Sequence, residues 1–335
     1  MPAPSLAALD NILEILRQAS CTPFRRDLTI TYIRITKYLD RLIPIFEASE
    51  DLESTDDLYK LCRIAKYMVL LADDDFFTHI IGDDIIIPFS GMFEHDPDFP
   101  NSHPQYRQYL SDPSRFKEVI PINDEAITQK IHYVFRLQYL KDVVLARMLD
   151  DNVTQLLNSK IFVYNLDIVT AIESNVDFLG QLVALISDPD AEELRKHNVV
   201  LFLHQYCTIA KSLQALVRSN VYRKLAQNGL FTVLEYALTC TLDRVRLAGC
   251  ELIMTIAEFD KLLLRSYILA QSKQSVRPLI DILVNQFTTD KAPGVQMQCY
   301  EILRILLDVQ VPAGSDAMQS ALIEGRGGNG NDQAP

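Results

Sequence analysis

The side chains that most often carry out catalysis or bind metals lie far apart in this sequence. The six histidines are His79, His95, His103, His132, His197 and His204. None of them forms a pair at the three- or four-residue spacing of a helical metal site. His197 and His204 are the closest two, but seven residues span about 10 Å along a helix. The sequence therefore predicts no metal site built from two histidines of one helix.

Motifs that carry chemistry are also missing. The chain contains no GxxxxGK[ST] phosphate loop, no GxSxG nucleophile turn and no HExxH zinc helix. Two acidic runs, at residues 73–75 and 83–84, and the triplet of residues 94–96 could be metal ligands or an acid/base pair. Solvated turn and cap residues are the favoured interpretation, because acidic side chains commonly cap helices. We therefore predict that the protein is not an enzyme and uses no metal and no cofactor.

The most distinctive segment runs from Phe116 to Asp142 and reads FKEVIPINDEAITQKIHYVFRLQYLKD. At 100° per residue, His132, Arg136 and Tyr139 share one stripe of a helix whose remaining surface is largely apolar. A helix of this kind is expected to be buried. Its polar stripe must then find partners, because an unpaired buried polar group costs ~1–3 kcal/mol.

Two interpretations of this stripe remain open. In one, it forms an internal network in which Arg136 pairs with Glu118 or Asp142 and His132 bonds to a carbonyl oxygen. In the other, it is a recognition patch on which Arg136 and Lys117 bind carboxylates or phosphates of a partner. Arg25 and Arg26 either cap a helix or join this patch. The hypothetical partner-binding residues are Arg25, Arg26, Lys117, Glu118, Lys130, His132, Arg136, Gln138, Tyr139 and Asp142.

Composition excludes several classes of protein. Of 335 residues, 48% are hydrophobic and 23% are charged, as in a folded globular chain. Only six of the 11 glycines precede residue 311, too few for the loops of doubly wound sheets and for β-hairpins. The net charge of -12 argues against direct nucleic-acid binding, which needs a dense basic face. No apolar run reaches the ~18 residues of a membrane span.

The cysteines and the N-terminus indicate an intracellular protein. The six cysteines lie far apart and form no CxxC pair, so we expect reduced thiols packed in a core. The first ten residues lack the basic start and the apolar stretch of a signal peptide.

Apolar residues recur at three- and four-residue steps almost throughout, which predicts amphipathic helices. Helix starts are expected at the caps Thr55, Asp112, Asn123 and Asp188. Acidic or polar turns recur near residues 51, 96, 188, 243 and 290, and most intervals indicate a period in the mid-forties. This period is typical of HEAT and armadillo repeats. The predicted fold is all-α, an armadillo/HEAT-like helical-repeat solenoid.

The clearest repeat runs from Leu225 to Asp260. Gly229 separates two helices there, and the second of the following pair has Leu247 and Cys250 on one face. Because such repeats bury their apolar faces by stacking, we expect one domain over residues 5–311. A loop insertion is expected near residues 96–114, and a flexible tail over residues 312–335.

The distinctive segment also carries a family resemblance. Phe116 to Ile122, Asp124, Lys130 to His132, Arg136, Gln138, Tyr139 and Asp142 resemble the signature block of protein phosphatase 4 regulatory subunit 3, the SMEK or falafel family. Arg25-Arg26, Glu50 to Leu58 and Glu94 to Pro97 support the resemblance. It covers about residues 9–311. The family's usual N-terminal pleckstrin-like domain and long polar C-terminal tail have no counterpart here, so the chain is expected to be the armadillo-like core alone.

The resemblance implies a non-catalytic regulatory or scaffold subunit of a serine/threonine phosphatase. Its implied partners are the phosphatase 4 catalytic subunit, regulatory subunit 2 and phosphoprotein substrates, including those of DNA-damage signalling. Location in the nucleus, and also in the cytoplasm, is implied as well. The alternative is another armadillo-type adaptor, such as a transport receptor for basic peptides, which the net charge of -12 favours weakly.

Overall fold

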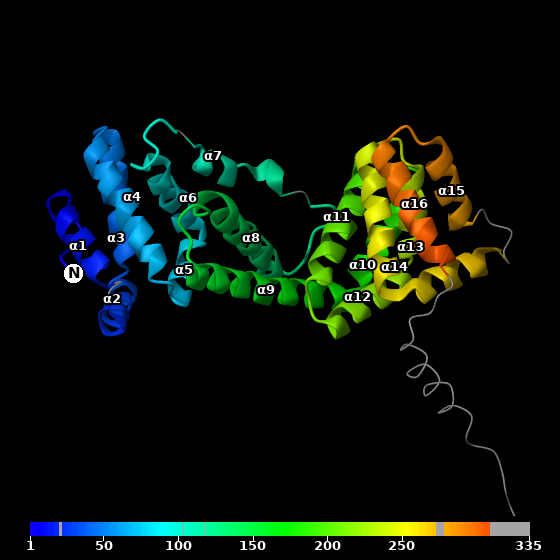
Figure 1. Cartoon of the computed structure of the whole chain (residues 1–335), viewed down its shortest axis with the longest axis horizontal. Coiled ribbons are helices and arrows are strands. Elements are labelled where there is room, and N and C mark those ends of the chain that lie inside the picture. The colour runs from blue at the N-terminus through cyan, green and yellow to red at the C-terminus, as the bar shows by residue number, and fades with distance from the viewer. Residues whose placement is uncertain (20–21, 103, 117, 273–277, 309–335) are drawn as a thin grey trace, which may run out of the picture. The chain divides into compact units, whose positions relative to one another are not determined.

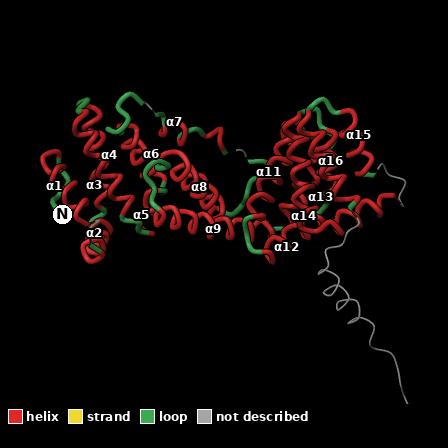
Figure 2. Tube along the Cα trace, viewed as in Figure 1, coloured by secondary structure: helices red, strands yellow, loops and turns green. Residues whose placement is uncertain are grey.

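The computed structural model describes residues 1–19, 22–102, 104–116, 118–272 and 278–308, and in this part of the chain the regular structure is helical, with no strand (Figure 2). The predicted all-α class is therefore confirmed. The first ten α-helices are α1 (Leu9–Ala19), α2 (Pro23–Ile35), α3 (Tyr38–Asp51), α4 (Thr55–Leu70), α5 (Asp74–Ile80), α6 (Asp83–Met92), α7 (Tyr106–Leu110), α8 (Glu125–Tyr139), α9 (Asp151–Ser174) and α10 (Val176–Ser187).

The other helices are α11 (Glu193–Lys211), α12 (Ala215–Gln227), α13 (Leu230–Thr239), α14 (Asp243–Ser272), α15 (Leu279–Thr289) and α16 (Pro293–Leu307) (Figure 1). Asp260 interrupts α14 with non-helical backbone angles. Short 3-10 turns occur at Leu6–Ala8, Phe93–His95 and Pro113–Arg115, and a π-helical turn at Leu140–Val144 follows α8. The predicted insertion thus includes the short helix α7.

The chain divides into two compact units. The first comprises Met1–Leu185 and Thr208–Asn228, and the second comprises Ile186–Cys207 and the chain from Gly229 onward. The single domain over residues 5–311 stays a prediction, and most of the expected tail lies outside the described residues. No single described helix has the length and apolarity to cross a membrane, although the bent pair α9–α10 meets both criteria together.

Apolar stripes hold the first unit together. Leu9, Ile12 and Leu16 are fully buried where α1 packs on α4. Further along, α8 and α9 lie side by side (Figure 1). At ~25 cal/mol per Å² of buried apolar surface, these stripes supply the main free energy that favours folding.

Helical hairpins build the second unit. Helices α11, α14 and α16 begin at Glu193, Asp243 and Pro293, a spacing of 50 residues each time. The observed spacing of 50 residues is longer than the predicted period in the mid-forties. The prediction was measured between acidic residues, and these occupy different places in their turns. Gly229 adopts a left-handed φ of 93° between α12 and α13, as its place in the predicted repeat requires. α13–α14 packs on α15–α16.

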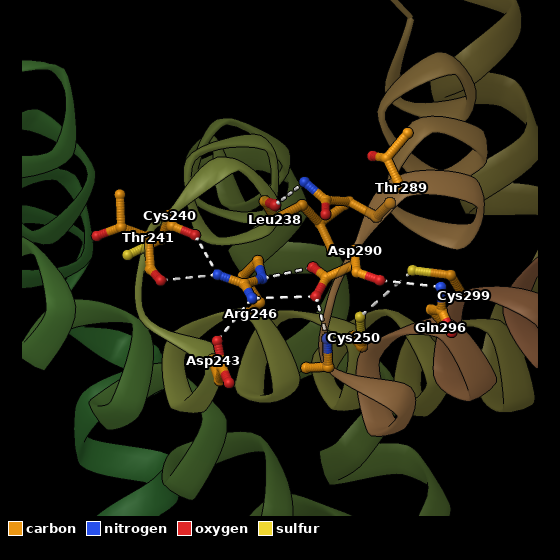
Figure 3. A network of polar contacts seen from close by, with 12 residues as sticks. Leu238, Cys240, Thr241, Asp243, Arg246, Cys250, Thr289, Asp290, Gln296 and Cys299 are labelled. Carbon is orange, nitrogen blue, oxygen red and sulfur yellow. Dashed lines mark hydrogen bonds and ion pairs between the residues drawn. The ribbon is translucent and has the colours of Figure 1, made fainter.

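A buried ion pair joins these two hairpins (Figure 3). The guanidinium of Arg246 lies 2.7 Å from Asp290 Oδ2, and the Asp290 side chain is only 2% exposed. Arg246 also donates to the carbonyls of Cys240 and Thr241 and to Asp243. The turn before α14 is therefore tied to the turn before α16.

Three of the predicted helix caps are displaced. Ser54, and not Thr55, is the N-cap of α4, and Asp124, and not Asn123, is the N-cap of α8. The Asp124 carboxylate accepts from Ile127 N–H, which satisfies a free donor of the first turn. Asp188 lies in a turn before α11, which begins only at Glu193. Asp112 caps a 3-10 turn by accepting from Ser114 N–H.

The described cysteines Cys62, Cys207, Cys240, Cys250 and Cys299 are all buried and free of disulfides. Their burial agrees with thiols that pack in a core. Cys21 lies outside the described residues.

Candidate partner-binding surfaces of the first unit

Arg136, in the middle of the polar stripe of α8, fastens this helix to the turn between α5 and α6. Its guanidinium donates to the Ile81 carbonyl oxygen at 2.6 Å and to Asp83 Oδ1 at 2.5 Å. The side chain is 15% exposed. The expectation that Arg136 pairs with Glu118 or Asp142 in an internal network was therefore wrong. The bonded groups come from more than fifty residues earlier in the chain, where helical periodicity gives no information.

The other two members of the stripe pack against rings. The ring centroids of His132 and Phe116 lie 4.0 Å apart. The expected hydrogen bond from His132 to a carbonyl oxygen is therefore replaced by a contact between rings. Tyr139 stacks on Tyr109 of α7 with 4.3 Å between centroids and 7° between planes. Arg115 lies over the ring of Tyr109, with its guanidinium carbon 4.1 Å from the ring centroid. The insertion is thereby folded onto α8.

These surroundings change two pKa values. Burial, and secondarily the positive charge of Arg136, lower the pKa of His132. Burial raises the pKa of Tyr139 to about 12. The imidazole and the phenol are therefore both held neutral near pH 7, so these two groups serve packing better than they serve recognition of an anion.

The remaining residues of the segment are more accessible. Lys130 pairs with Asp167 of α9 at 2.6 Å. Glu118, Gln138 and Asp142 are exposed. Lys117 lies outside the described residues. Because His132, Arg136 and Tyr139 are occupied by contacts within the chain, the exposed Glu118, Gln138 and Asp142 are the part of the predicted patch best placed to meet a partner.

A second polar network anchors the insertion on its other side. Arg107 of α7 forms a bidentate pair with Glu50, at 2.8 and 2.9 Å, and also binds Glu94. His95 Nε2 lies 3.0 Å from Glu50 Oε1. Burial raises the pKa of Glu50, but hydrogen bonds from Arg107 and His95 outweigh it and lower the pKa below its ordinary value. Glu94 and His95 thus belong to a structural clamp around Arg107 and Glu50, whereas Asp96 pairs with Lys66 at 2.7 Å.

The sequence prediction missed Arg107, the centre of this clamp. A single arginine thirteen residues after Glu94 has no distinguishing spacing. The acidic residues could have indicated a nearby cation, because several carboxylates close together in a folded protein need a positive charge beside them.

A groove of about 580 Å³ opens between the N-terminal part of α2, the turn before α5, and α9. Its wall combines polar and apolar side chains, namely Arg26, Ala72, Asp74, Asn152, Gln155, Leu156, Ser159, Lys160, Val163 and Tyr164. This volume is in the usual range of ligand sites. Among the predicted site residues, only Arg26 lines it.

Two cations are held in this groove. Arg26 donates from Nε to the Leu71 carbonyl at 2.8 Å. Lys160 is 10% exposed and donates to Asp74 Oδ2 at 2.9 Å and to Thr78 Oγ1 at 2.7 Å. Arg25, by contrast, is exposed and donates to Gln18 Oε1 at 3.3 Å. Lys160 was missed because α9 reads as an ordinary amphipathic helix.

The acidic run 73–75 is fully used by the chain. Asp73 caps α5 by accepting from Phe76 N–H, Asp74 binds Lys160, and Asp75 binds Arg34 at 2.6 Å. Across the described ranges, no group of three His, Cys, Asp or Glu side chains is arranged to hold a metal ion.

A family model described as phosphatase 4 regulatory subunit 3 matches residues 11–329 of the chain. The chain belongs to this family. It is 34% identical to an uncharacterized protein of Schizosaccharomyces pombe, and it is 31% identical to both serine/threonine-protein phosphatase 4 regulatory subunit 3 of Drosophila melanogaster and Suppressor of Mek1 of Dictyostelium discoideum.

These matches cover 92%, 92% and 94% of the chain but only 38%, 32% and 30% of the three relatives. The chain therefore spans about a third of the length of these three relatives. No solved structure matches it.

Proposed function

We propose that the chain is a non-catalytic regulatory or scaffold subunit of a serine/threonine phosphatase 4 complex. The observation that carries this proposal is the family match over residues 11–329. The helical-repeat fold agrees with it, because stacked repeats present long surfaces suited to binding other proteins.

The proposed partners are the phosphatase 4 catalytic subunit and regulatory subunit 2, with phosphoproteins of the nucleus and of DNA-damage signalling as substrates of the complex. The proposed location is the nucleus, and also the cytoplasm. The Drosophila relative, whose name is that of a phosphatase 4 regulatory subunit, supports the assignment to a phosphatase complex.

Two surfaces of the first unit are proposed to contact the partners. One is the groove of α2, α5 and α9, where Leu156, Val163 and Tyr164 favour apolar groups and the lining holds two cations, Arg26 and Lys160, against one acid, Asp74. The other is the exposed edge of α8 with its flanking segments: Glu118 precedes the helix, Gln138 lies on it and Asp142 lies in the turn that follows.

A binding experiment with the purified catalytic subunit and regulatory subunit 2 tests the proposal. Wild-type chain should bind at least one of them, and Val163→Arg in the groove should weaken binding by about tenfold or more. Phe162→Arg is the matched control, because Phe162 is a neighbouring exposed residue of α9 (37% exposed against 51% for Val163) that does not line the groove.

Some outcomes of this experiment test the proposed function, and others test only which surface makes the contact. Failure of the wild-type chain to bind either subunit would contradict the proposed function. Binding that survives Val163→Arg but is lost with Gln138→Arg would move the contact to α8. Binding of a basic peptide that disappears at high salt would favour the adaptor alternative, although the cations of the groove do not suit such a peptide.

A further inference from the structure

The thiol of Cys240 lies beside a base in the second unit. Cys240 follows α13, in the turn that leads to α14 (Figure 3). Its Sγ atom is 3.2 Å from Nε2 of His197 on α11, and both residues belong to the same compact unit. An imidazole nitrogen at this distance can accept the proton of the thiol. The thiolate that results is the nucleophilic form of cysteine.

A carboxylate lies next to the same imidazole nitrogen. Glu193 Oε2 is 3.7 Å from His197 Nε2 and accepts the Tyr236 O–H at 2.7 Å. The hydrogen bond from Tyr236 is the main cause that lowers the pKa of Glu193, so this side chain stays negatively charged near pH 7. Its charge attracts the imidazolium that forms when His197 takes the thiol proton. A nucleophile, a base and a group that supports the base are the parts of an activated cysteine.

The other described cysteines are less suited to react. Cys240 is 8% exposed, whereas Cys207 is 1% exposed and Cys62, Cys250 and Cys299 are 0% exposed. Burial raises the pKa of Cys62 and of Cys207 to about 12, so these two thiols stay protonated near pH 7. Cys240 thus combines access for a molecule as small as hydrogen peroxide with a neighbouring base.

We propose that Cys240 is a site of reversible oxidation by hydrogen peroxide, with His197 as the base that activates its thiol. His197 Nε2 takes the thiol proton, and the thiolate sulfur attacks one peroxide oxygen, so that an S–O bond forms as the O–O bond breaks. The hydroxide that leaves takes the proton from the imidazolium and departs as water. The sulfur loses two electrons to the peroxide, and the product is the sulfenic acid of Cys240.

The oxidised sulfur belongs to the turn that joins two hairpins. The Cys240 carbonyl accepts from Arg246, whose guanidinium pairs with Asp290 in the turn before α16. Oxidation therefore acts next to the ion pair that connects α13–α14 to α15–α16. The site belongs to the second unit, whereas both surfaces proposed for the phosphatase subunits belong to the first. It does not depend on the proposed function.

Differential labelling of the full chain tests this proposal. The folded protein is exposed to hydrogen peroxide for increasing times, the peroxide is destroyed with catalase, and the remaining thiols are alkylated with iodoacetamide after unfolding. Mass spectrometry of the cysteine-containing peptides then gives a rate of oxidation for each cysteine. Cys240 should be oxidised about tenfold or more faster than Cys62 and Cys207. Dithiothreitol should restore its thiol, because a sulfenic acid is reversible.

Substitution of the base separates activation from accessibility. His197→Phe keeps a ring near Tyr236, whose centroid lies 6.4 Å from that of His197. It should slow the oxidation of Cys240 by about tenfold or more. A purely structural role of His197 would give the opposite sign, because a loosened site exposes the thiol. His79→Phe is the matched control, since His79 pairs with the Asp40 carboxylate at 3.0 Å in the first unit, and it should leave the rate unchanged.

Glu193→Gln is a second variant, which retains the shape of the side chain and removes its charge. It should slow the oxidation of Cys240, although less than His197→Phe does. Two results would overturn the proposal: a wild-type chain in which Cys240 is oxidised no faster than Cys62, or a rate for Cys240 that His197→Phe does not lower. If His197→Phe also makes the buried Cys250 reactive, the unit has opened, and an unchanged rate for Cys240 in Glu193→Gln then overturns the proposal.

Discussion

Three arginines of this chain connect segments that are distant in sequence. Arg136 joins α8 to the turn before α6, Arg107 joins α7 to α3, and Arg246 joins two successive hairpins. Each guanidinium offers several donors in a fixed plane, so one side chain can satisfy carbonyl and carboxylate groups from different elements at once. Residues that suggest chemistry in the sequence are here used for structure.

His132 provides a test of this view through pH. Its pKa in the folded chain is lowered below the ordinary 6.5 by burial and by Arg136, with Asp83 and Glu118 opposing the shift. The unfolded chain therefore binds the proton more readily. Stability contributed by the neutral imidazole is present above pH 6.5 and is lost as the pH falls through 6.5 toward the folded pKa.

Urea unfolding of wild type and of His132→Gln at several pH values between about 7.5 and 5.5 measures this pH-dependent contribution of His132 to the free energy of unfolding. The free energy of unfolding of wild type should fall more steeply with decreasing pH than that of the variant. Equal slopes would contradict the assignment. Because every other histidine is present in both proteins, the difference between the slopes isolates His132.

Among the helices, the close approach of α14 to α13 depends on Gly249. A Cβ atom added at this position would lie 2.8 Å from Ala237 Cβ, so the two helices could not keep their distance. At Gly180 of α10, by contrast, nothing lies within 4 Å of the added atom. The two glycines can therefore be compared directly, because Gly249 is required for helix packing and Gly180 is not.

We expect Gly180→Ala to stabilise the protein by ~0.5–1 kcal/mol, because alanine is the better helix former. Gly249→Ala gains the same helix propensity but suffers overpacking of ~1–3 kcal/mol. Chemical denaturation of both variants should therefore differ by about this amount. A Gly249→Ala protein as stable as Gly180→Ala would mean that α13 and α14 separate without cost.

At the level of the whole molecule, energetic effects should stay local, because each repeat contacts only its neighbours. Asp290→Ala leaves the Arg246 guanidinium without its buried carboxylate and should cost ~3 kcal/mol. Asp243→Ala removes a carboxylate that is 67% exposed and should cost less than ~1 kcal/mol.

Hydrogen exchange measured by mass spectrometry locates the loss. With Asp290→Ala, amide protection should fall in α13–α16 and remain unchanged in α1–α8, which belong to the other compact unit. A uniform loss of protection over both units would instead indicate that the chain unfolds as a single cooperative body.

The amino-acid sequence by itself determined the fold class, the repeated hairpins and the family. Helical periodicity, few glycines and the hairpin after Gly229 are local properties, since residues three and four apart meet on one helix whatever surrounds it. The segment from Phe116 to Asp142 pointed to the family for a similar reason. A long run of matched residues does not depend on knowing which of them touch.

Only the tertiary structure decided what each polar side chain binds. Arg136 could pair with Glu118, Asp142 or Asp83 by charge alone, and the tertiary fold, which brings the turn between α5 and α6 to Arg136, selects Asp83. Lys160 lines the groove because the fold brings α9 to α5, where the Lys160 ammonium binds Asp74 and Thr78. Such choices depend on contacts between residues far apart in the chain. These contacts form only when apolar faces bury one another, so no local pattern encodes them.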